Sequence, residues 1–214
     1  MNATRIKICG LKTIESIDAA IAAGADFIGL VFFGPSPRNL TTAEARPLAE
    51  HVAGRAKVVA LMVDPDDALV ADVARTIKPD LIQLHGSETP QRATAIAALS
   101  GIPVMKAVKV ETKADARRAH DYADVCATIL FDAKAPKGAP LPGGNGVPFD
   151  WHALEDVGEN LDYMLSGGLT PENVAEAIRL TGAPAVDVSS GVESAPGVKD
   201  TARIRAFIEA VKAV

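Results

Sequence analysis

The sequence is poor in the residue types that mark several large classes of protein. Aromatic residues make up 4% of its 214 residues, and cysteine occurs only twice, as Cys9 and Cys126. Two cysteines are too few for a disulfide framework or a cysteine-based structural zinc site, so we expect a reducing compartment, the cytoplasm. No apolar run reaches the roughly 18 residues that cross a membrane, and the first residues lack the apolar region of a signal peptide.

Positive charge is also scarce. The net charge is −5 and there is no basic run, which excludes the surface on which nucleic-acid binding depends. Charged residues, at 23%, are as frequent as in ordinary folded proteins, and the 48% of hydrophobic residues supply a core of Ala, Val, Ile and Leu. The length predicts one domain, residues 1–214. An acidic, aromatic-poor surface indicates no clear interface, so a monomer is favoured and a dimer is the alternative.

Short β-branched segments alternate along the chain with Ala-rich segments of helical period. The strand-like segments are residues 5–9, 27–31, 58–62, 81–85, 104–108, 128–132, 163–166 and 185–188. The helical segments between them include 13–23 and 199–213, and others that start near Ala43 (capped by Thr42), at Pro65, at Pro90 and at Pro171. Such alternation indicates parallel strands joined by right-handed crossovers.

Eight such units predict an α/β protein with a single (β/α)8 barrel, or TIM barrel. The alternative is an open doubly wound sheet, which usually carries a Gly-rich fingerprint after its first strand. Here the first strand is followed by Cys9-Gly10-Leu11-Lys12, without that fingerprint. Residues 133–149 are crowded with Pro and Gly inside the repeat, which is typical of a functional loop rather than a linker.

Polar residues collect where the predicted strands end, which is where active sites lie in this fold. Side chains two residues apart share a face of a strand, so Lys7 and Cys9 are expected inside the barrel, with Ile6 and Ile8 facing the helices. The same alternation turns four further polar side chains inward: Gln83, His85, Asp132 and Asp187. A buried Lys7 then requires a carboxylate or other acceptors nearby.

Two Gly-rich turns follow the seventh and eighth predicted strands. Gly167-Gly168 and Ser190-Gly191 expose backbone N–H groups at the corner where this fold often binds phosphate. The alternative is that these glycines serve tight turns alone. No cluster of His, Asp or Glu has metal-ligand spacing, and no metal or organic cofactor is expected.

Together these segments resemble the phosphoribosylanthranilate isomerase (TrpF) family of tryptophan biosynthesis. The matching segments run in order along nearly the whole chain: Lys7-Ile8-Cys9-Gly10-Leu11, 27–32, Ser36-Pro37-Arg38, 84–88, 130–132, Ser166-Gly167-Gly168-Leu169 and 186–193. The resemblance implies an Amadori rearrangement of N-(5-phosphoribosyl)anthranilate to 1-(2-carboxyphenylamino)-1-deoxyribulose 5-phosphate, without metal or cofactor. This reaction requires one general acid and one general base on opposite sides of the sugar.

The resemblance also implies a role for each site residue. It implies Cys9 as the base and Asp132 as the acid. A thiol of ordinary pKa, ~8.5, is mostly protonated at neutral pH, so Cys9 requires a cation or dipole nearby. The pKa of the Asp132 carboxyl must instead be raised, which Lys7 opposes unless its charge is paired. It also implies that Arg38 binds the anthranilate carboxylate and that His85 and Asp187 form hydrogen bonds with the substrate. Residues 133–149 would form a lid. The residues implied to bind the phosphate are Gly167, Gly168, Ser190 and Gly191.

Two other functions compete with this one. Another phosphosugar enzyme of this fold, such as indoleglycerol-phosphate synthase, requires a catalytic lysine and glutamate at strand ends that are not obvious here. A non-catalytic barrel that binds phosphosugars would not require Cys9 and Asp132. For the single residues, Cys9 as a buried apolar thiol and Asp132 as a loop cap are the structural alternatives.

Overall fold

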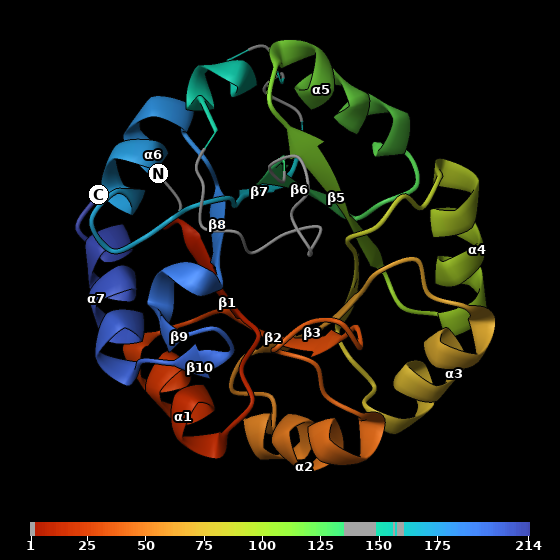
Figure 1. The fold of residues 1–214 in the computed structure, drawn as a ribbon. Helices are drawn as coiled ribbons and strands as arrows, with labels where there is room; N and C mark the ends of the chain where they lie inside the picture. Colours follow the sequence, from red (N-terminus) through yellow and green to blue (C-terminus); the bar gives the residue numbers. More distant parts are fainter. Residues whose placement is uncertain (1–2, 135–148, 156, 158–160) are drawn as a thin grey trace.

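The computed structural model describes residues 3–134, 149–155, 157 and 161–214, and these form a closed barrel of eight parallel strands inside a ring of helices (Figure 1). The strands are β1 (Arg5–Cys9), β2 (Phe27–Phe32), β3 (Lys57–Met62), β4 (Leu81–Leu84), β5 (Val104–Val110), β6 (Thr128–Ala133), β7 (Tyr163–Leu165) and β8 (Ala185–Val188). Each pairs with the next, and β1 pairs with β8 to close the cylinder. The predicted (β/α)8 barrel is confirmed, with strand limits displaced by two residues at most.

Helices follow most of the strands. They are α1 (Ile14–Ala23), α2 (Thr42–Val52), α3 (Asp67–Thr76), α4 (Pro90–Ser100), α5 (Lys113–Arg117) with the 3-10 helix η1 (Arg118–Tyr122), α6 (Val174–Thr181) and α7 (Thr201–Lys212). The described part of the β6–β7 connection carries only the short 3-10 helix η2 (Trp151–Leu154). None of the described helices is long and apolar enough to span a membrane.

Local capping chemistry explains where the helices start. Thr89 accepts a hydrogen bond from the Arg92 N–H and Pro90 takes the first helical position, as predicted. Three other predicted starts are wrong. Thr41, not Thr42, caps α2, and the cap of α3 is Asp66, so Pro65 lies before that helix. The third, α6, begins three residues after Pro171, because a turn intervenes.

The packing of the barrel confirms the predicted alternation. One cluster fills the barrel interior: Phe27, Val59, Leu81, Met105, Ala107, Leu130, Met164 and Ala185. Ile6 and Ile8 instead belong to the larger core between strands and helices, so Lys7 and Cys9 on the same strand face inward. The polar residues two positions beyond the interior cluster therefore lie above it, at the carboxyl ends of the strands.

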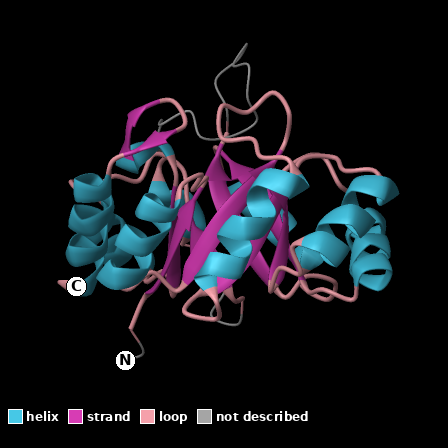
Figure 2. Ribbon diagram, turned by 90° about the horizontal axis from the view of Figure 1, so that it is seen from below, coloured by secondary structure: helices cyan, strands magenta, loops and turns pink. Residues whose placement is uncertain are grey.

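A small antiparallel hairpin, not predicted from the sequence, follows the barrel. The 3-10 helix η3 (Ser190–Val192) leads into β9 (Glu193–Ala195), which pairs with β10 (Val198–Lys199). The predicted last helix began at Lys199, but that residue lies in β10, and α7 starts after the Asp200 cap. In Figure 2 the hairpin stands at the end of the barrel away from the N-terminus, the end at which the polar residues collect.

Candidate functional site

Cys9 ends β1 on the inner wall of the barrel and is 4% exposed. It packs with Val31 and Leu61 above the interior cluster. Gly29 on the neighbouring strand makes room for it, since a Cβ there would lie 3.0 Å from Cys9 Sγ. Burial raises the pKa of the Cys9 thiol, and the largest opposing influence is the positive charge of Lys7. The thiol is thus buried but has the nearby cation that a catalytic base requires.

Lys7 is the buried cation below Cys9. Its side chain is fully buried, and its Nζ donates to Asp187 Oδ1 on β8 over 2.7 Å. Ser166 donates to the other oxygen of Asp187 over 3.1 Å. Burial lowers the pKa of Lys7, but Asp187 and Cys9 together raise it above its ordinary value, so the residue stays an ammonium. Its charge is paired with Asp187 on β8, which is the condition predicted from the sequence for Lys7 and Asp132 to coexist inside the barrel.

Asp132 lies near the end of β6 and is 4% exposed. Its Oδ2 is 3.0 Å from His85 Nε2, and His85 Nδ1 is 3.0 Å from the amide nitrogen of Gln83. With the Gln83 amide as donor, Nδ1 is an acceptor and the ring proton sits on Nε2, facing Asp132. This row of three side chains fixes one carboxyl oxygen of Asp132, while Gln83 Oε1 is buried and has no hydrogen-bond partner among the residues that the structure describes. His85, predicted to bind substrate, here contacts the predicted acid.

The Gly-rich turns follow β7 and β8. Gly167 and Gly168 have φ angles of 86° and 66°, which favour glycine. At Gly191, in η3, a Cβ would lie 1.9 Å from the Leu169 carbonyl oxygen, so only glycine fits there. Ser190 begins η3, with only Ser189 between it and the end of β8. Because β7 and β8 lie between β6 and β1 in the closed order, the two turns lie between Asp132 and Cys9 around the rim.

Arg38 comes from the loop after β2 and is 6% exposed. Its Nε and Nη2 donate to the two carboxylate oxygens of Glu193 on β9, each over 2.8 Å. A Cβ on Gly10 would lie 2.6 Å from Arg38 Cδ, so the arginine stem crosses the backbone immediately after Cys9. The predicted carboxylate-binding residue therefore lies next to the predicted base.

Two charged residues at this end of the barrel were not predicted from the sequence. Glu193 and Lys199, both on the hairpin, have side chains 4% and 3% exposed and are joined by an ion pair of 2.7 Å. Glu193 closes the 186–193 segment that carries the resemblance, which is the one signal that pointed to it. Lys199 was assigned to a helix, and no sequence signal marked it as buried.

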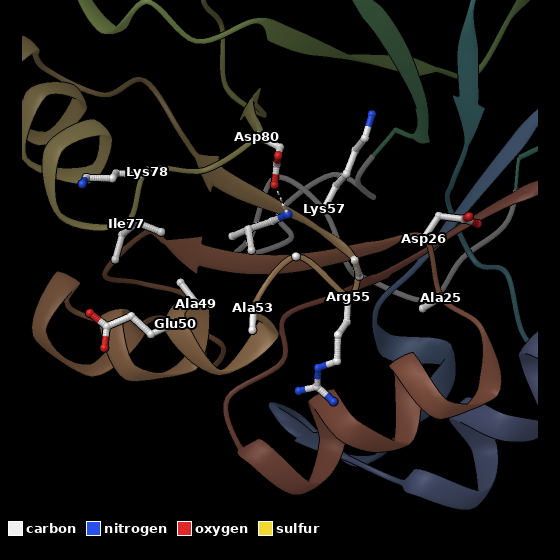
Figure 3. A pocket seen from close by; sticks show the side chains of 13 residues that line it. Ala25, Asp26, Ala49, Glu50, Ala53, Arg55, Lys57, Ile77, Lys78 and Asp80 are labelled. Atoms are coloured by element: carbon white, nitrogen blue, oxygen red, sulfur yellow. Dashed lines mark hydrogen bonds between the residues drawn. The ribbon is translucent and has the colours of Figure 1, made fainter.

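Two further features lie outside this constellation. No group of three or more His, Cys, Asp or Glu residues in the described part of the chain is arranged to hold a metal ion. A cavity of about 610 Å3 opens where α2 leads into β3, lined by residues such as Asp26, Arg55, Lys57 and Asp80 (Figure 3). These residues precede or begin strands, so the cavity lies at the opposite end of the barrel and contains none of the predicted site residues.

Comparison with known proteins decides the family. The sequence model of the family described as N-(5'phosphoribosyl)anthranilate (PRA) isomerase matches residues 6–210. The chain belongs to this isomerase family. A relative named N-(5'-phosphoribosyl)anthranilate isomerase from Rhodopseudomonas palustris (strain BisA53) is 56% identical over 208 residues, covering 97% of this chain and 95% of the relative. The predicted resemblance is confirmed.

Solved structures of phosphoribosylanthranilate isomerases share the fold. One, in complex with reduced 1-(o-carboxyphenylamino)-1-deoxyribulose 5-phosphate, is 34% identical, with a TM-score of 0.86 and coverage of 99% of this chain and 100% of that chain. Another, described as monomers generated from the dimeric enzyme of Thermotoga maritima, is 35% identical, with a TM-score of 0.84 and coverage of 99% and 100%. The family thus includes a dimeric member.

The predicted lid, residues 133–149, lies mostly outside the described residues, which omit 135–148.

Proposed function

We propose that this chain converts N-(5-phosphoribosyl)anthranilate into 1-(2-carboxyphenylamino)-1-deoxyribulose 5-phosphate, with Cys9 as general base and Asp132 as general acid. The observation that carries the assignment is that a thiol and a carboxyl face the same barrel interior from β1 and β6 in a chain of this family. An aldose-to-ketose rearrangement requires such a pair on the two sides of one sugar.

The acid acts first. Asp132 gives its proton to the ring oxygen of the ribose as the C1–O bond breaks, and the nitrogen lone pair forms an iminium at C1. The His85 N–H binds Oδ2 of Asp132, which leaves Oδ1 to hold the proton that is transferred. The charge of Lys7 is paired with Asp187 on β8.

The base acts second. The iminium acidifies the C2–H bond, the Cys9 thiolate takes that proton, and the bond electrons form the enolamine. Loss of the enol proton and protonation at C1 then give the ketone. The positive charges of Lys7 and Lys199 both lower the pKa of Cys9, opposing the rise that burial causes. These cations favour the thiolate that the step requires.

The two ends of the substrate bind on either side of this pair. The phosphate binds at the turns after β7 and β8, where Gly167, Gly168, Ser190 and Gly191 can present backbone N–H groups to an anion. The anthranilate carboxylate binds Arg38, whose planar guanidinium suits a carboxylate. Asp187 supplies a hydrogen bond to the sugar.

Replacing the acid or the base tests the mechanism. Cys9→Ala and Asp132→Asn are each expected to lower kcat by about 10²- to 10⁴-fold in a steady-state assay with substrate generated in place. Circular dichroism and a thermal melt establish that both variants fold. Cys126→Ala is the matched control, since that thiol packs in the outer core and its kcat should match the wild type. Normal turnover by either site variant contradicts the mechanism.

Replacing Arg38 tests the carboxylate assignment. Arg38→Ala is expected mainly to raise KM, because the interaction is made in the ground state and the transition state alike. A change confined to kcat would contradict that role.

The proposed setting of the enzyme is the cytoplasm, where the two free thiols of Cys9 and Cys126 stay reduced. A monomer remains the prediction for its assembly, and the dimeric relative from Thermotoga maritima makes the dimer the alternative. Light scattering on the purified chain distinguishes the two.

A further inference from the structure

A buried cluster of three charged side chains joins the hairpin to the β2–α2 loop. Glu193 accepts hydrogen bonds from Arg38 Nε and Nη2, from Lys199 Nζ over 2.7 Å and from the Gly197 N–H over 3.2 Å. All three charged side chains are at most 8% exposed. The cluster is therefore largely shielded from solvent, where an unbalanced charge costs far more than at the surface.

Lys199 is an ammonium in this arrangement. Its Nζ donates to Glu193 Oε1, to the Ser189 carbonyl oxygen over 2.9 Å and to Ser189 Oγ over 3.3 Å. Three acceptors use all three N–H bonds of an ammonium, whereas a neutral amine has only two. Burial lowers the pKa of Lys199 below its ordinary value, with Arg38 adding to that effect, while the Glu193 carboxylate opposes the fall. The cluster thus holds two cations and one anion, a net charge of +1.

The free edge of Arg38 is where the balancing anion belongs. Glu193 occupies Nε and one N–H of Nη2, which leaves Nη1 and the second N–H of Nη2 as an unused fork. Among the residues that the structure describes, no hydrogen bond uses Nη1. A fork of two parallel N–H bonds matches a carboxylate. The stem of the same arginine crosses Gly10, the residue after Cys9.

Glu193 would by itself repel a second carboxylate at this position. The hairpin is held against the β2–α2 loop, since a Cβ on Gly197 would lie 2.5 Å from the Pro37 carbonyl oxygen, and so Glu193 cannot readily withdraw. Lys199 removes the repulsion by neutralising Glu193 through Oε1, the oxygen that also accepts from Arg38 Nε. Glu193 can then fix the guanidinium without cancelling the charge that attracts the ligand.

We propose that Glu193 and Lys199 are positioning residues that make Arg38 selective for substrates with a carboxylate: Glu193 orients the guanidinium, and Lys199 keeps the net charge of the cluster positive. This inference rests on the proposed function, in which Arg38 binds the anthranilate carboxylate. It assigns the specificity to the charge balance of the hairpin rather than to Arg38 alone.

The test compares two stable ligands that differ only in the carboxylate. They are reduced 1-(o-carboxyphenylamino)-1-deoxyribulose 5-phosphate and its phenylamino counterpart without the carboxyl group, and calorimetry gives both Kd values for each variant. Lys199→Met leaves Arg38 and Glu193 as a neutral pair, so the preference for the carboxylated ligand should fall by about tenfold or more. The Kd of the phenylamino ligand should stay unchanged.

The double variant Lys199→Met/Glu193→Gln gives the decisive comparison. It restores a net charge of +1, now on Arg38 alone, so its preference for the carboxylated ligand should recover above that of Lys199→Met. If the two residues had a purely structural role, the double variant would show a smaller preference for the carboxylated ligand than Lys199→Met does, or the variants would bind both ligands more weakly by the same factor. Either result overturns the inference. Thermal melts confirm that both variants fold. Glu193→Gln alone is not used, because it would leave Arg38 and Lys199 as two buried cations without an anion.

The wild-type protein separates this inference from the proposed function. If wild type binds neither ligand and does not turn over phosphoribosylanthranilate, the proposed function fails. If it turns over that substrate but binds both ligands equally, the carboxylate role of Arg38 fails, and the inference fails with it. A wild-type preference that Lys199→Met leaves intact overturns the inference alone.

Discussion

Lys7 and Asp187 act on the Cys9 thiol in opposite directions. The Lys7 ammonium lowers the pKa of Cys9, the Asp187 carboxylate raises it, and the effect of Lys7 is the larger of the two. The ion pair between them is buried, so water screens its charges little. The Lys7–Asp187 pair thus helps to set the pKa of Cys9, the proposed base.

Two variants of this pair should move the thiol titration in opposite directions. Asp187→Asn removes the negative charge that, in addition to burial, raises the pKa of Cys9, so the thiol should ionise at lower pH. Lys7→Met/Asp187→Asn removes both influences without leaving a lone buried charge, and because Lys7 is the stronger, the thiol should ionise at higher pH. The ultraviolet absorbance of the thiolate, followed against pH, measures both shifts.

The titration requires a background in which Cys9 is the only thiol. Cys126→Ala supplies it, since burial raises the pKa of Cys126 to about 11 and its signal would otherwise overlap at alkaline pH. Since the thiolate is the proposed base, the rising limb of kcat/KM against pH should follow the same two directions. Shifts of the same sign in both variants would contradict the opposed roles of Lys7 and Asp187.

At the residue scale, the sequence predicted which way the side chains point but not which residues they contact. The inward direction of Lys7, Cys9 and Asp132 follows from the two-residue period of a strand, a local property that any strand shows. The pairing of Lys7 with Asp187 joins residues 180 positions apart and depends on closure between β1 and β8. The contact of His85 with Asp132 likewise crosses from the end of β4 to β6, and no local pattern encodes it.

Among the elements, β5 is linked to the loop after β4 by a second buried ion pair. Lys106 Nζ donates to Glu88 Oε2 and to the Gly86 carbonyl oxygen, each over 2.8 Å, and the two side chains are 4% and 1% exposed. Glu88 also accepts from the Asp64 N–H over 2.7 Å. The pair therefore fixes the loops after β3 and β4, next to the position of His85.

Lys106→Met is expected to destabilise the fold by about 3–5 kcal/mol, because it leaves the Glu88 carboxylate buried without its cation. Chemical denaturation measures the free energy of unfolding. Lys106→Met/Glu88→Gln should recover part of the loss, since no lone charge remains. Arg46→Gln, which breaks the exposed pair with Glu50, is the control and should leave the midpoint unchanged. A loss as small as that of the control would show that the buried pair does not hold these loops.

The sequence predicted elements well where local chemistry decides them and less well where packing does. Eight strands and the cap at Thr89 follow from side-chain type and spacing. The hairpin does not, because Glu193-Ser194-Ala195-Pro196-Gly197 has no strand alternation, and its shape comes from Glu193 bonding to Arg38 and Gly197 packing on Pro37. The late start of α6 has a different, local cause, since Asn173 Oδ1 accepts a hydrogen bond from the Thr170 N–H in a turn that precedes the helix.

At the scale of the whole molecule, the fold is a closed ring. Strand β1 pairs with β8, and the last helix, α7, reaches back to the first, with Lys212 Nζ donating to the Ala23 carbonyl oxygen at the end of α1. These contacts close the ring without a peptide bond, and they place the end of α7 at the end of the barrel opposite to the site (Figure 2). The sequence predicted the number of strand–helix units. Closure of the ring is the arrangement that leaves no strand at an unpaired edge of the sheet.

A circular permutant should therefore keep both fold and activity when the chain is reopened at that opposite end. We expect this for a permutant whose termini are joined by a flexible linker of about ten residues and whose new ends lie between Gly54 and Arg55. Both are exposed in the turn between α2 and β3, and a Cβ on Gly54 would touch nothing within 4 Å. Steady-state kinetics should give a kcat and KM close to those of the original chain, with a modest fall in melting temperature.

The matched permutant is opened on the other side of the barrel, between Gly34 and Pro35, which are also exposed. It breaks the loop that carries Arg38 but cuts no strand or helix, so it should fold and retain kcat while KM rises, because Arg38 loses one covalent tether beside Glu193. Loss of folding in the Gly54 permutant would show that the contacts of β1 with β8 and of α7 with α1 require the original chain order. Equal KM values in the two permutants would show that the carboxylate site does not depend on the β2–α2 loop.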